Sequence, residues 1–166
     1  MAHFPQEPTQ KSLVLRSLSE NDREVYLRCY GEAWELAHAT REGFDAERTW
    51  LWALWRAGVS DQAVRMAYFP DGRFAGILAL DEKRSAADGV LWVSFLFVEG
   101  TERGTGLGRA LLGAAEARAR ELGRSRLALC TAKMNSALRF YEHLGFLRTG
   151  TEPGALEALI VLEKEI

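Results

Sequence analysis

Three glycines within five residues, Gly104, Gly106 and Gly108, form the pattern in this sequence that points most directly to chemistry. They lie between an apolar segment and a helical segment, where glycine permits backbone angles and close approaches that a side chain would block. The first amides of a helix carry unpaired N–H groups and a partial positive charge, and Arg103 and Arg109 add full charges. The turn is therefore a candidate site for a phosphate or pyrophosphate group, although a strand-to-helix turn can need glycine for its shape alone.

Two common phosphate motifs do not fit this turn. A dinucleotide fingerprint that began at Gly104 would need a third glycine where the chain has Arg109, and the next strand ends at Thr131 without the acidic residue that binds ribose. A P-loop would end in Gly-Lys-Ser or Gly-Lys-Thr, whereas Gly108 is followed by Arg109 and Ala110. A nicotinamide enzyme and a nucleotide hydrolase are therefore disfavoured.

The apolar periodicity predicts the elements that have to position the turn. Strands are expected over 13–15, 63–68, 74–80, 90–98, 126–131, 146–148 and 156–164, and helices over 22–36, about 49–57, 107–122 and 135–144. The segment 90–98 is almost wholly apolar, which is typical of a central strand covered on both faces. We therefore predict a mixed α/β fold with six or seven strands in one mixed sheet and helices on both faces.

The same periodicity predicts which helix faces are buried. On the helix over 22–36, we expect one apolar stripe, and on the helix over 107–122 we expect an apolar face and a solvent face. The residues of the stripe are Val25, Cys29, Ala33 and Leu36; the inward residues of the long helix are Leu111, Leu112, Ala115 and Ala119, and its outward residues are Glu116, Arg118 and Arg120.

Two segments resemble the sequence elements of one enzyme family. Residues 103–112 resemble the Arg/Gln-x-x-Gly-x-Gly/Ala element of the GCN5-related N-acetyltransferases (GNAT), and residues 137–146 are similar to the family's Ala-x-x-x-Tyr-x-x-x-Gly-Phe element. The two elements occur in the expected order, and the resemblance covers roughly residues 11–165. It implies a GNAT-like acyltransferase fold and transfer of an acetyl group from acetyl-coenzyme A (acetyl-CoA) to a primary amine of a small molecule or peptide.

The resemblance also implies roles for individual residues. In this family the strand before the glycine turn splays from its neighbour at a bulge, and the backbone groups freed there bind the pantetheine arm of coenzyme A (CoA). By position, these groups belong to Leu96, Phe97 and Val98. The pyrophosphate would be held by Arg103, Gly104, Thr105, Gly106, Leu107, Gly108 and Arg109.

Tyr141 matches the family's general acid. A phenol with a pKa near ~10 keeps its proton at neutral pH and can give it to a departing thiolate. The alternative is a half-buried aromatic side chain that only packs on its helix.

The chain departs from the family pattern at two places. The family usually has asparagine where this chain has Met134, so Asn135, one residue later, is either a cofactor ligand or a helix cap. Some members carry a glutamate base on the central strand, whereas residues 91–95 contain no carboxylate. A water relay through Ser94 or an acid from the helical region would then take the amine's proton. The helical candidates are Glu32, Glu35, His38 and Glu47, for which a solvated helix face is the more common explanation.

Three further side-chain types, tryptophan, cysteine and histidine, are candidates for a functional role. Four tryptophans, Trp34, Trp50, Trp52 and Trp55, lie in the region that covers the acceptor site in similar proteins, and core packing is favoured over a pocket for an apolar amine. Cys130 lies in a predicted buried strand, which disfavours a catalytic thiol. His143 is expected at the surface or at the helix end.

The composition is that of one soluble domain, with 166 residues of which 48% are hydrophobic and 27% charged. We expect a flexible N-terminal tail over residues 1–10 and a single acetyltransferase domain over 11–166. A formal net charge of -2 gives no field that would attract nucleic acid or a membrane, and no apolar stretch reaches the ~18 residues of a membrane span. The only cysteines, Cys29 and Cys130, are far apart and predict neither a disulfide nor a metal site. A cytoplasmic location is expected, and a homodimer is left open.

Two other functions fit the same motifs. One is an acyltransferase that uses another donor, such as succinyl-CoA, and the other is a non-catalytic acyl-CoA sensor. Donor specificity and turnover separate them, and the sequence does not name the acceptor because acceptor specificity depends on loops and helices around a shared cofactor site.

Overall fold

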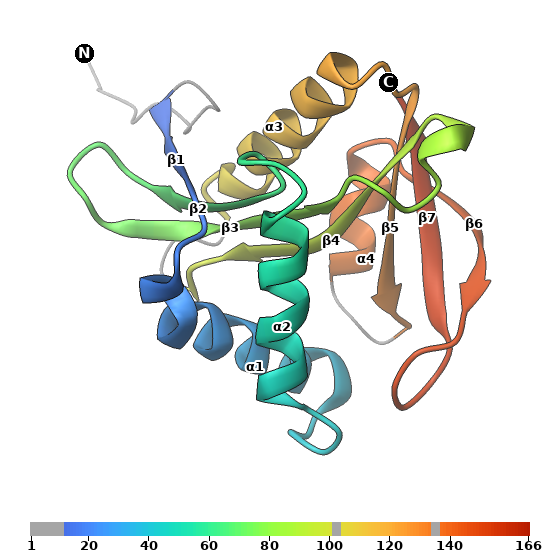
Figure 1. Ribbon diagram of the computed structural model, residues 1–166. Coiled ribbons are helices and arrows are strands. Elements are labelled where there is room, and N and C mark those ends of the chain that lie inside the picture. The colour runs from blue at the N-terminus through green and yellow to red at the C-terminus, as the bar shows by residue number, and fades with distance from the viewer. Residues whose placement is uncertain (1–11, 101–103, 134–136) are drawn as a thin grey trace, which may run out of the picture.

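The computed structural model describes residues 12–100, 104–133 and 137–166, so the predicted tail over 1–10 lies outside the described residues. Within those ranges, seven strands form one sheet in the order β1-β2-β3-β4-β5-β7-β6 (Figure 1). The strands are β1 (Val14–Ser17), β2 (Val64–Tyr68), β3 (Phe74–Asp81), β4 (Val90–Val98), β5 (Arg126–Ala132), β6 (Leu147–Glu152) and β7 (Leu159–Glu165). The prediction of a mixed sheet with 90–98 at its centre is confirmed.

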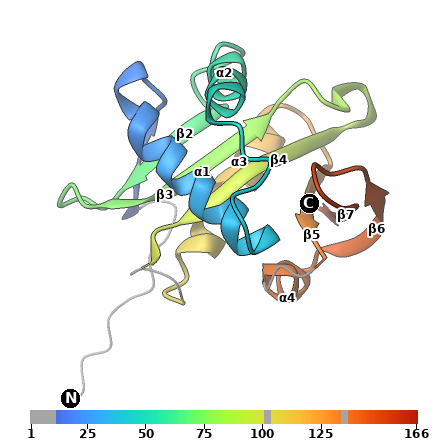
Figure 2. The same cartoon turned by 90° about the horizontal axis from the view of Figure 1, so that it is seen from below.

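Helices cover both faces of the sheet (Figure 2). The helices α1 (Arg23–His38) and α2 (Ala46–Ala57) pack on one face, and α3 (Leu107–Glu121) and α4 (Ala137–His143) pack on the other. Each face has its own apolar core, because the side chains of a strand point alternately to the two faces. The first core includes Tyr26, Trp50, Ile77 and Phe97, and the second includes Leu91, Leu111, Leu129, Tyr141 and Phe146.

The central strands β4 and β5 are hydrogen-bonded over only a short length. They run parallel, and their pairing is limited to residues 90–92 of β4 with 126–128 of β5. All other neighbouring strands are antiparallel. Beyond Trp92 the pairing ends and the two strands diverge. In Figure 1, β4 lies beside β5 where β4 begins and is separated from it where β4 ends.

A β-bulge at Ser94 changes the direction of the side chains along β4. On β3, Leu80 pairs with Val93 and Ala79 pairs with Phe95, so Ser94 is the extra residue. Before the bulge, odd-numbered residues such as Val93 face α3, whereas after it Phe95 faces α1 and α2. The bulge therefore lies where β4 separates from β5.

Two predicted helix faces are wrong in detail. The buried positions of α1 include Tyr26, Cys29 and Gly31, whereas Leu36 is 65% exposed because the packing of α1 on the sheet ends near Ala33. On α3, Arg118 was expected to face solvent, but only 14% of its side chain is exposed. Its guanidinium group bonds Glu82, a buried carboxylate in the loop that follows β3. A buried carboxylate needs a partner. In the sequence, Glu82 lies in a polar segment, which did not indicate that this side chain is buried and paired.

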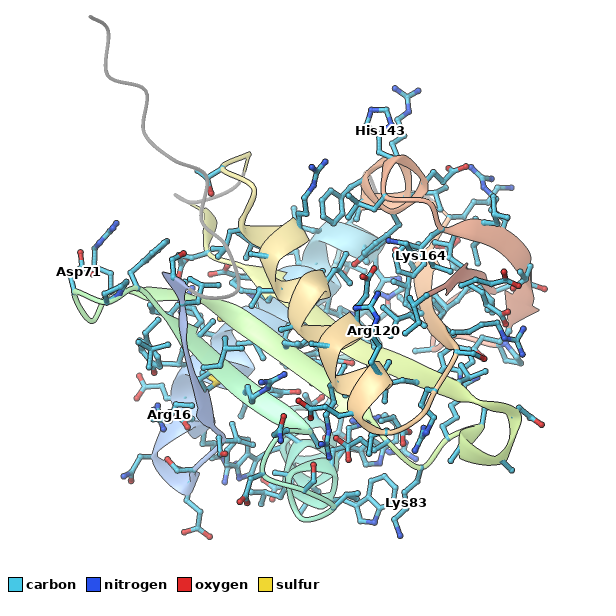
Figure 3. The ribbon with its side chains drawn as sticks, turned by 90° about the horizontal axis from the view of Figure 1, so that it is seen from above. Arg16, Asp71, Lys83, Arg120, His143 and Lys164 are labelled. Carbon is cyan, nitrogen blue, oxygen red and sulfur yellow. The ribbon has the colours of Figure 1, made fainter. Side chains whose placement is uncertain are left out.

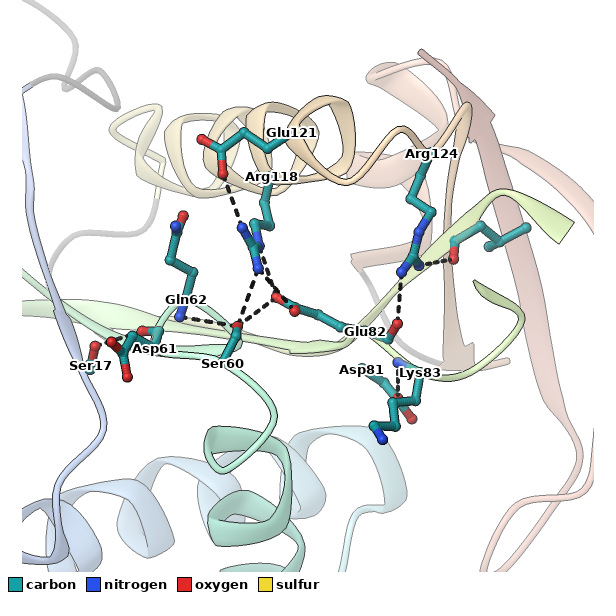
Figure 4. Close-up of polar contacts among 11 residues, drawn as sticks. Ser17, Ser60, Asp61, Gln62, Asp81, Glu82, Lys83, Arg118, Glu121 and Arg124 are labelled. Atoms are coloured by element: carbon teal, nitrogen blue, oxygen red, sulfur yellow. Dashed lines mark hydrogen bonds and ion pairs between the residues drawn. The ribbon is translucent and has the colours of Figure 1, made fainter. Parts of the chain in front are cut away.

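The Arg118–Glu82 pair joins α3 to the connection between β3 and β4 (Figure 4). Arg118 Nε donates to Glu82 Oε2 over 2.9 Å, and Ser60 Oγ donates to the same oxygen over 3.0 Å. The guanidinium group of Arg124 donates to the carbonyl oxygens of Val90 and Glu82, each over 2.9 Å. These bonds fix the start of β4, which is the part of the strand that pairs with β5.

Candidate active site

The glycine turn has the backbone geometry that its sequence predicted. Gly104 has φ +81 and Gly106 has φ +88, values that side-chain-bearing residues rarely adopt. Gly106 is the N-cap of α3, and the first turn of that helix contains no acidic residue. Leu107 is fully buried, which anchors the helix start in the core. The described part of the turn therefore presents an electropositive helix end without a competing carboxylate.

Gly108 serves a different purpose from the other two glycines. A Cβ atom built on Gly108 would lie 2.9 Å from Cζ of Phe140, whereas one built on Gly104 meets nothing within 4 Å. Gly108 therefore allows α3 and α4 to approach closely. Because Phe140 precedes Tyr141, this contact also links the glycine turn to the helix that carries the predicted acid.

The edge of β4 that faces the divergence supplies backbone groups. The Glu99 N–H group donates to the Ala75 carbonyl oxygen on β3, and Phe97 is paired with Ile77 of the same strand. At this end of β4, the backbone N–H and C=O groups of odd-numbered residues are therefore directed towards β3. Alternation then directs the N–H and C=O groups of Leu96 and Val98 towards β5. The backbone of Phe97, also a predicted ligand, bonds β3 inside the sheet, and its side chain is buried against α1 and α2.

Tyr141 reaches the sheet from α4 and is mostly buried. Its ring packs edge-on against Phe146, with the ring centroids 5.8 Å apart. Burial raises the pKa of Tyr141 to about 12, and the nearby Cys130 thiol contributes in the same direction. The phenol is therefore protonated at every pH at which the protein would work, as a proton donor must be.

Cys130 lies on β5 just past the end of the β4–β5 pairing. It interacts electrostatically with Tyr141 of α4 and with Tyr30 of α1, so it lies between residues from opposite faces of the sheet. Burial and a hydrogen bond to the Glu152 carboxylate raise the pKa of Cys130 to about 12. A thiol with so high a pKa is a poor nucleophile, which agrees with the expectation that it is not catalytic.

Comparison with known proteins decides the family. The model of the acetyltransferase (GNAT) family matches residues 23–146, which include the glycine turn, the divergence of β4 and β5, and Tyr141. The chain belongs to the GNAT family. It is thus an acyl-CoA-dependent N-acyltransferase, and comparison with curated proteins gave no match.

Solved structures of this family share the fold of the chain. A GCN5-related N-acetyltransferase from Kribbella flavida has a TM-score of 0.71 at 22% identity, over 95% of this chain and 100% of that chain. The PaiA N-acetyltransferase of Thermoplasma acidophilum, in complex with coenzyme A, has a TM-score of 0.66 at 19% identity, over 93% and 99%. A structure of yncA from Salmonella typhimurium with its cofactor acetyl-CoA has the same TM-score and identity, over 92% and 93%.

The structure describes only some of the other predicted site residues of this acetyltransferase. Ser94 is at the bulge, and its hydroxyl donates to the Ala79 carbonyl over 3.1 Å. The lone pairs of that hydroxyl can still accept a hydrogen bond. Arg109 is exposed on the first turn of α3. Arg103 and Asn135 lie outside the described residues, and so does Met134.

The candidate bases of the helical region are engaged elsewhere. Glu32 pairs with Arg28, Glu35 with Arg41 and Glu47 with Arg23, and these are exposed pairs on the helix surface. The ring of His38 packs on Trp34 with the centroids 4.5 Å apart. These contacts agree with the expectation of a solvated helix face. His143, labelled in Figure 3, points into solvent from α4.

The positions of the aromatic residues on the α1 and α2 side of the sheet were only partly predicted. Core packing is correct for Trp50, but Trp52 and Trp55 are about half exposed on α2. The aromatic residues near the β4–β5 divergence are instead Tyr30 and its ring neighbours Phe44 and Phe95. Tyr26, Tyr30 and Trp34 are spaced four residues apart, so they lie on one face of α1. This spacing is the sequence signal that predicts the aromatic face, whereas the positions of the tryptophans alone do not.

The described residues bear on membranes and metals in two ways. No helix among them has the length and apolarity to cross a membrane. The same part of the chain contains no group of three or more His, Cys, Asp or Glu side chains arranged to hold a metal ion.

Proposed function

We propose that this protein transfers the acetyl group of acetyl-CoA to a primary amine by direct attack, with Tyr141 as the general acid. The observation that carries the proposal is the end of the β4–β5 pairing after Trp92, with the glycine turn following β4 and Tyr141 next to Cys130 on β5. The PaiA and yncA structures, which hold coenzyme A or acetyl-CoA, support the donor.

The residues present fit acetyl-CoA. The left-handed Gly104 and Gly106 and the acid-free start of α3 suit a pyrophosphate, with the amides from Gly104 to Arg109 as donors. The backbone of Leu96, which lies beyond the β4–β5 pairing and is directed towards β5, suits an amide group of the pantetheine arm, and the backbone of Val98 is directed to the same side. Phe97 is not part of this proposal, because its backbone bonds β3.

The chemical step needs one acid and one proton acceptor. The lone pair of the neutral amine forms a C–N bond to the thioester carbonyl carbon, and the C–S bond breaks. The departing thiolate takes the Tyr141 proton, and the nitrogen loses its extra proton to water. Because the candidate bases Glu32, Glu35 and Glu47 are held in surface ion pairs, a water bound by Ser94 at the bulge is the route that we propose for that proton.

Thiol release from acetyl-CoA across a broad amine panel tests the function. Release that depends on an amine, with a new amide detected by mass spectrometry, supports the transferase. Binding of acetyl-CoA in isothermal titration without release for any amine would instead favour an acyl-CoA sensor, and faster release from succinyl-CoA would identify a different donor.

A further inference from the structure

An ion pair lies beside the divergence of β4 and β5 and has no part in the proposed step. Arg84, in the loop after β3, binds Glu152, the last residue of β6, through both guanidinium Nη atoms and both carboxylate oxygens. The Arg84 guanidinium carbon lies 3.5 Å from the centroid of the Trp92 ring. Trp92 is the last residue of β4 that pairs with β5, so the ion pair is next to the point where the strands separate.

One residue connects this pair to the proposed acid. The Cys130 thiol hydrogen-bonds Glu152 and interacts electrostatically with Tyr141 and Tyr30. Cys130 and Glu152 face the same side of the sheet, because Ala132, Leu159 and Glu152 are aligned across β5, β7 and β6. Glu152 therefore contacts the residue of β5 that also interacts with Tyr141.

The pair has unused hydrogen-bonding capacity. A guanidinium group has five N–H donors, and Glu152 uses only two of the Arg84 nitrogens. A carboxylate has about four lone-pair sites, of which Arg84 and Cys130 occupy three. The Arg84 side chain is 43% exposed and that of Glu152 21%, so both can meet a ligand. Together they present a fixed positive and a fixed negative group side by side.

Apolar rings flank the same region. Tyr30 packs against Phe95 with centroids 4.7 Å apart and against Phe44 with centroids 6.2 Å apart. A Cβ atom built on Gly43, next to Phe44, would lie 3.5 Å from the Leu156 side chain. The α1–α2 connection and the β6–β7 connection therefore approach one another on the face of the sheet that α1 and α2 cover.

We propose that the amine acceptor is an α-amino acid with an apolar or aromatic side chain, whose carboxylate binds Arg84 and whose amine donates to Glu152. This inference rests on the proposed function. Arginine recognises carboxylates through paired N–H donors, and stacking on Trp92 orients the guanidinium plane beforehand. Glu152 stabilises the positive charge that grows on the nitrogen as the C–N bond forms. The acceptor side chain lies against Tyr30, Phe44 and Phe95.

A matched set of acceptors tests the inference. L-Phenylalanine, its amide and 2-phenylethylamine share the ring and the amine but differ in the carboxylate. In thiol-release assays with acetyl-CoA, we expect kcat/KM for phenylalanine to exceed that for the other two by at least about tenfold, since a charge-assisted bidentate pair contributes about 1.5–3 kcal/mol. Equal or better use of 2-phenylethylamine would overturn the inference.

Two variants and a control assign the effect to the ion pair. Arg84→Met should lower kcat/KM for phenylalanine about tenfold or more and lower that for 2-phenylethylamine much less, because only phenylalanine loses the carboxylate contact, whereas Glu152→Gln should lower the rates of all three acceptors to a similar extent. Arg148→Met removes a comparable surface pair with Glu142 and should change none of them.

The outcomes separate this inference from the proposed function. An equal loss for all acceptors in Arg84→Met would mean that the pair only supports the fold, and circular dichroism would detect misfolding. If Arg84→Met misfolds, Arg84→Lys keeps the charge but loses the paired donors and should still reduce the preference for phenylalanine. Release with amines that lack a carboxylate, but none with amino acids, would overturn the inference and leave the proposed function intact.

Discussion

At the scale of single residues, Tyr141 combines a buried ring with a phenol whose pKa is raised to about 12. Tyr141→Phe keeps the ring contact with Phe146, so we expect normal folding and normal acetyl-CoA affinity. The catalytic rate should fall by roughly tenfold to a thousandfold, because general acid catalysis typically contributes ~10²–10⁴ and thiolates leave well. Steady-state kinetics together with isothermal titration of acetyl-CoA measure both quantities. Full activity in the variant would mean that Tyr141 only packs and that solvent protonates the leaving sulfur.

The pH profile gives an independent check on the same residue. Since the raised pKa of Tyr141 keeps its proton in place below about 12, loss of the acid should not reduce the rate between pH 7 and 10. We expect kcat/KM to rise with pH as the acceptor amine loses its proton to water. A plateau that begins near pH 6–7 would indicate a carboxylate or histidine base in the protein instead.

Gly106 permits a controlled test of the anion site. Both Gly106 (φ +88) and Gly72 (φ +92) have left-handed backbones, but Gly72 is in the hairpin turn between β2 and β3. Valine at either position should cost about 1–2 kcal/mol of backbone strain, whereas only Gly106→Val should also weaken coenzyme A binding. Isothermal titration and thermal melts of both variants provide the comparison. Equal coenzyme A affinity in the two folded variants would argue against a pyrophosphate at this turn.

At the scale of elements, the Arg118–Glu82 pair holds α3 to the start of β4. Arg118→Met leaves a carboxylate buried without its partner, and breaking such a pair costs about 3–5 kcal/mol. The double variant Arg118→Met/Glu82→Gln removes the charge as well and should lose much less. Chemical denaturation of the wild type, of Arg118→Met, of Glu82→Gln and of the double variant measures the differences in the free energy of unfolding. If the loss in the double variant equals the sum of the losses in Arg118→Met and Glu82→Gln, the two residues do not act as a pair.

At the scale of the whole molecule, stability should decline on both sides of neutral pH. Burial raises the pKa of Cys29 and Cys130 from 9.0 to about 12, so above pH 9 the unfolded chain releases these protons first and folding is disfavoured. Arg84 lowers the pKa of Glu152 from 4.5, so its contribution is present above that pH and is lost below it. Thermal melts should show a plateau between about pH 5 and 9. In Cys29→Ala the alkaline decline should be smaller, and an unchanged decline would exclude Cys29 as its cause.

The sequence predicted the order of the elements and the position of the glycine turn, because both depend on local patterns of apolar residues and glycine. The family resemblance implied a bulge in this strand, but its position at Ser94 could not be predicted, since one small residue in an apolar strand does not reveal where pairing with β3 is interrupted. The buried Glu82 and the Arg84–Glu152 pair also escaped prediction. Each joins residues far apart in the chain, and a charge in a loop is normally solvated.

The bulge at Ser94 divides β4 into two halves in which the odd-numbered side chains face opposite sides of the sheet. In the first half, odd-numbered residues such as Val93 must suit α3, and in the second half the even-numbered residues do. Val93 and Phe95 pair with consecutive residues of β3, so a deletion of Ser94 would remove the bulge and keep the faces of residues 95–98.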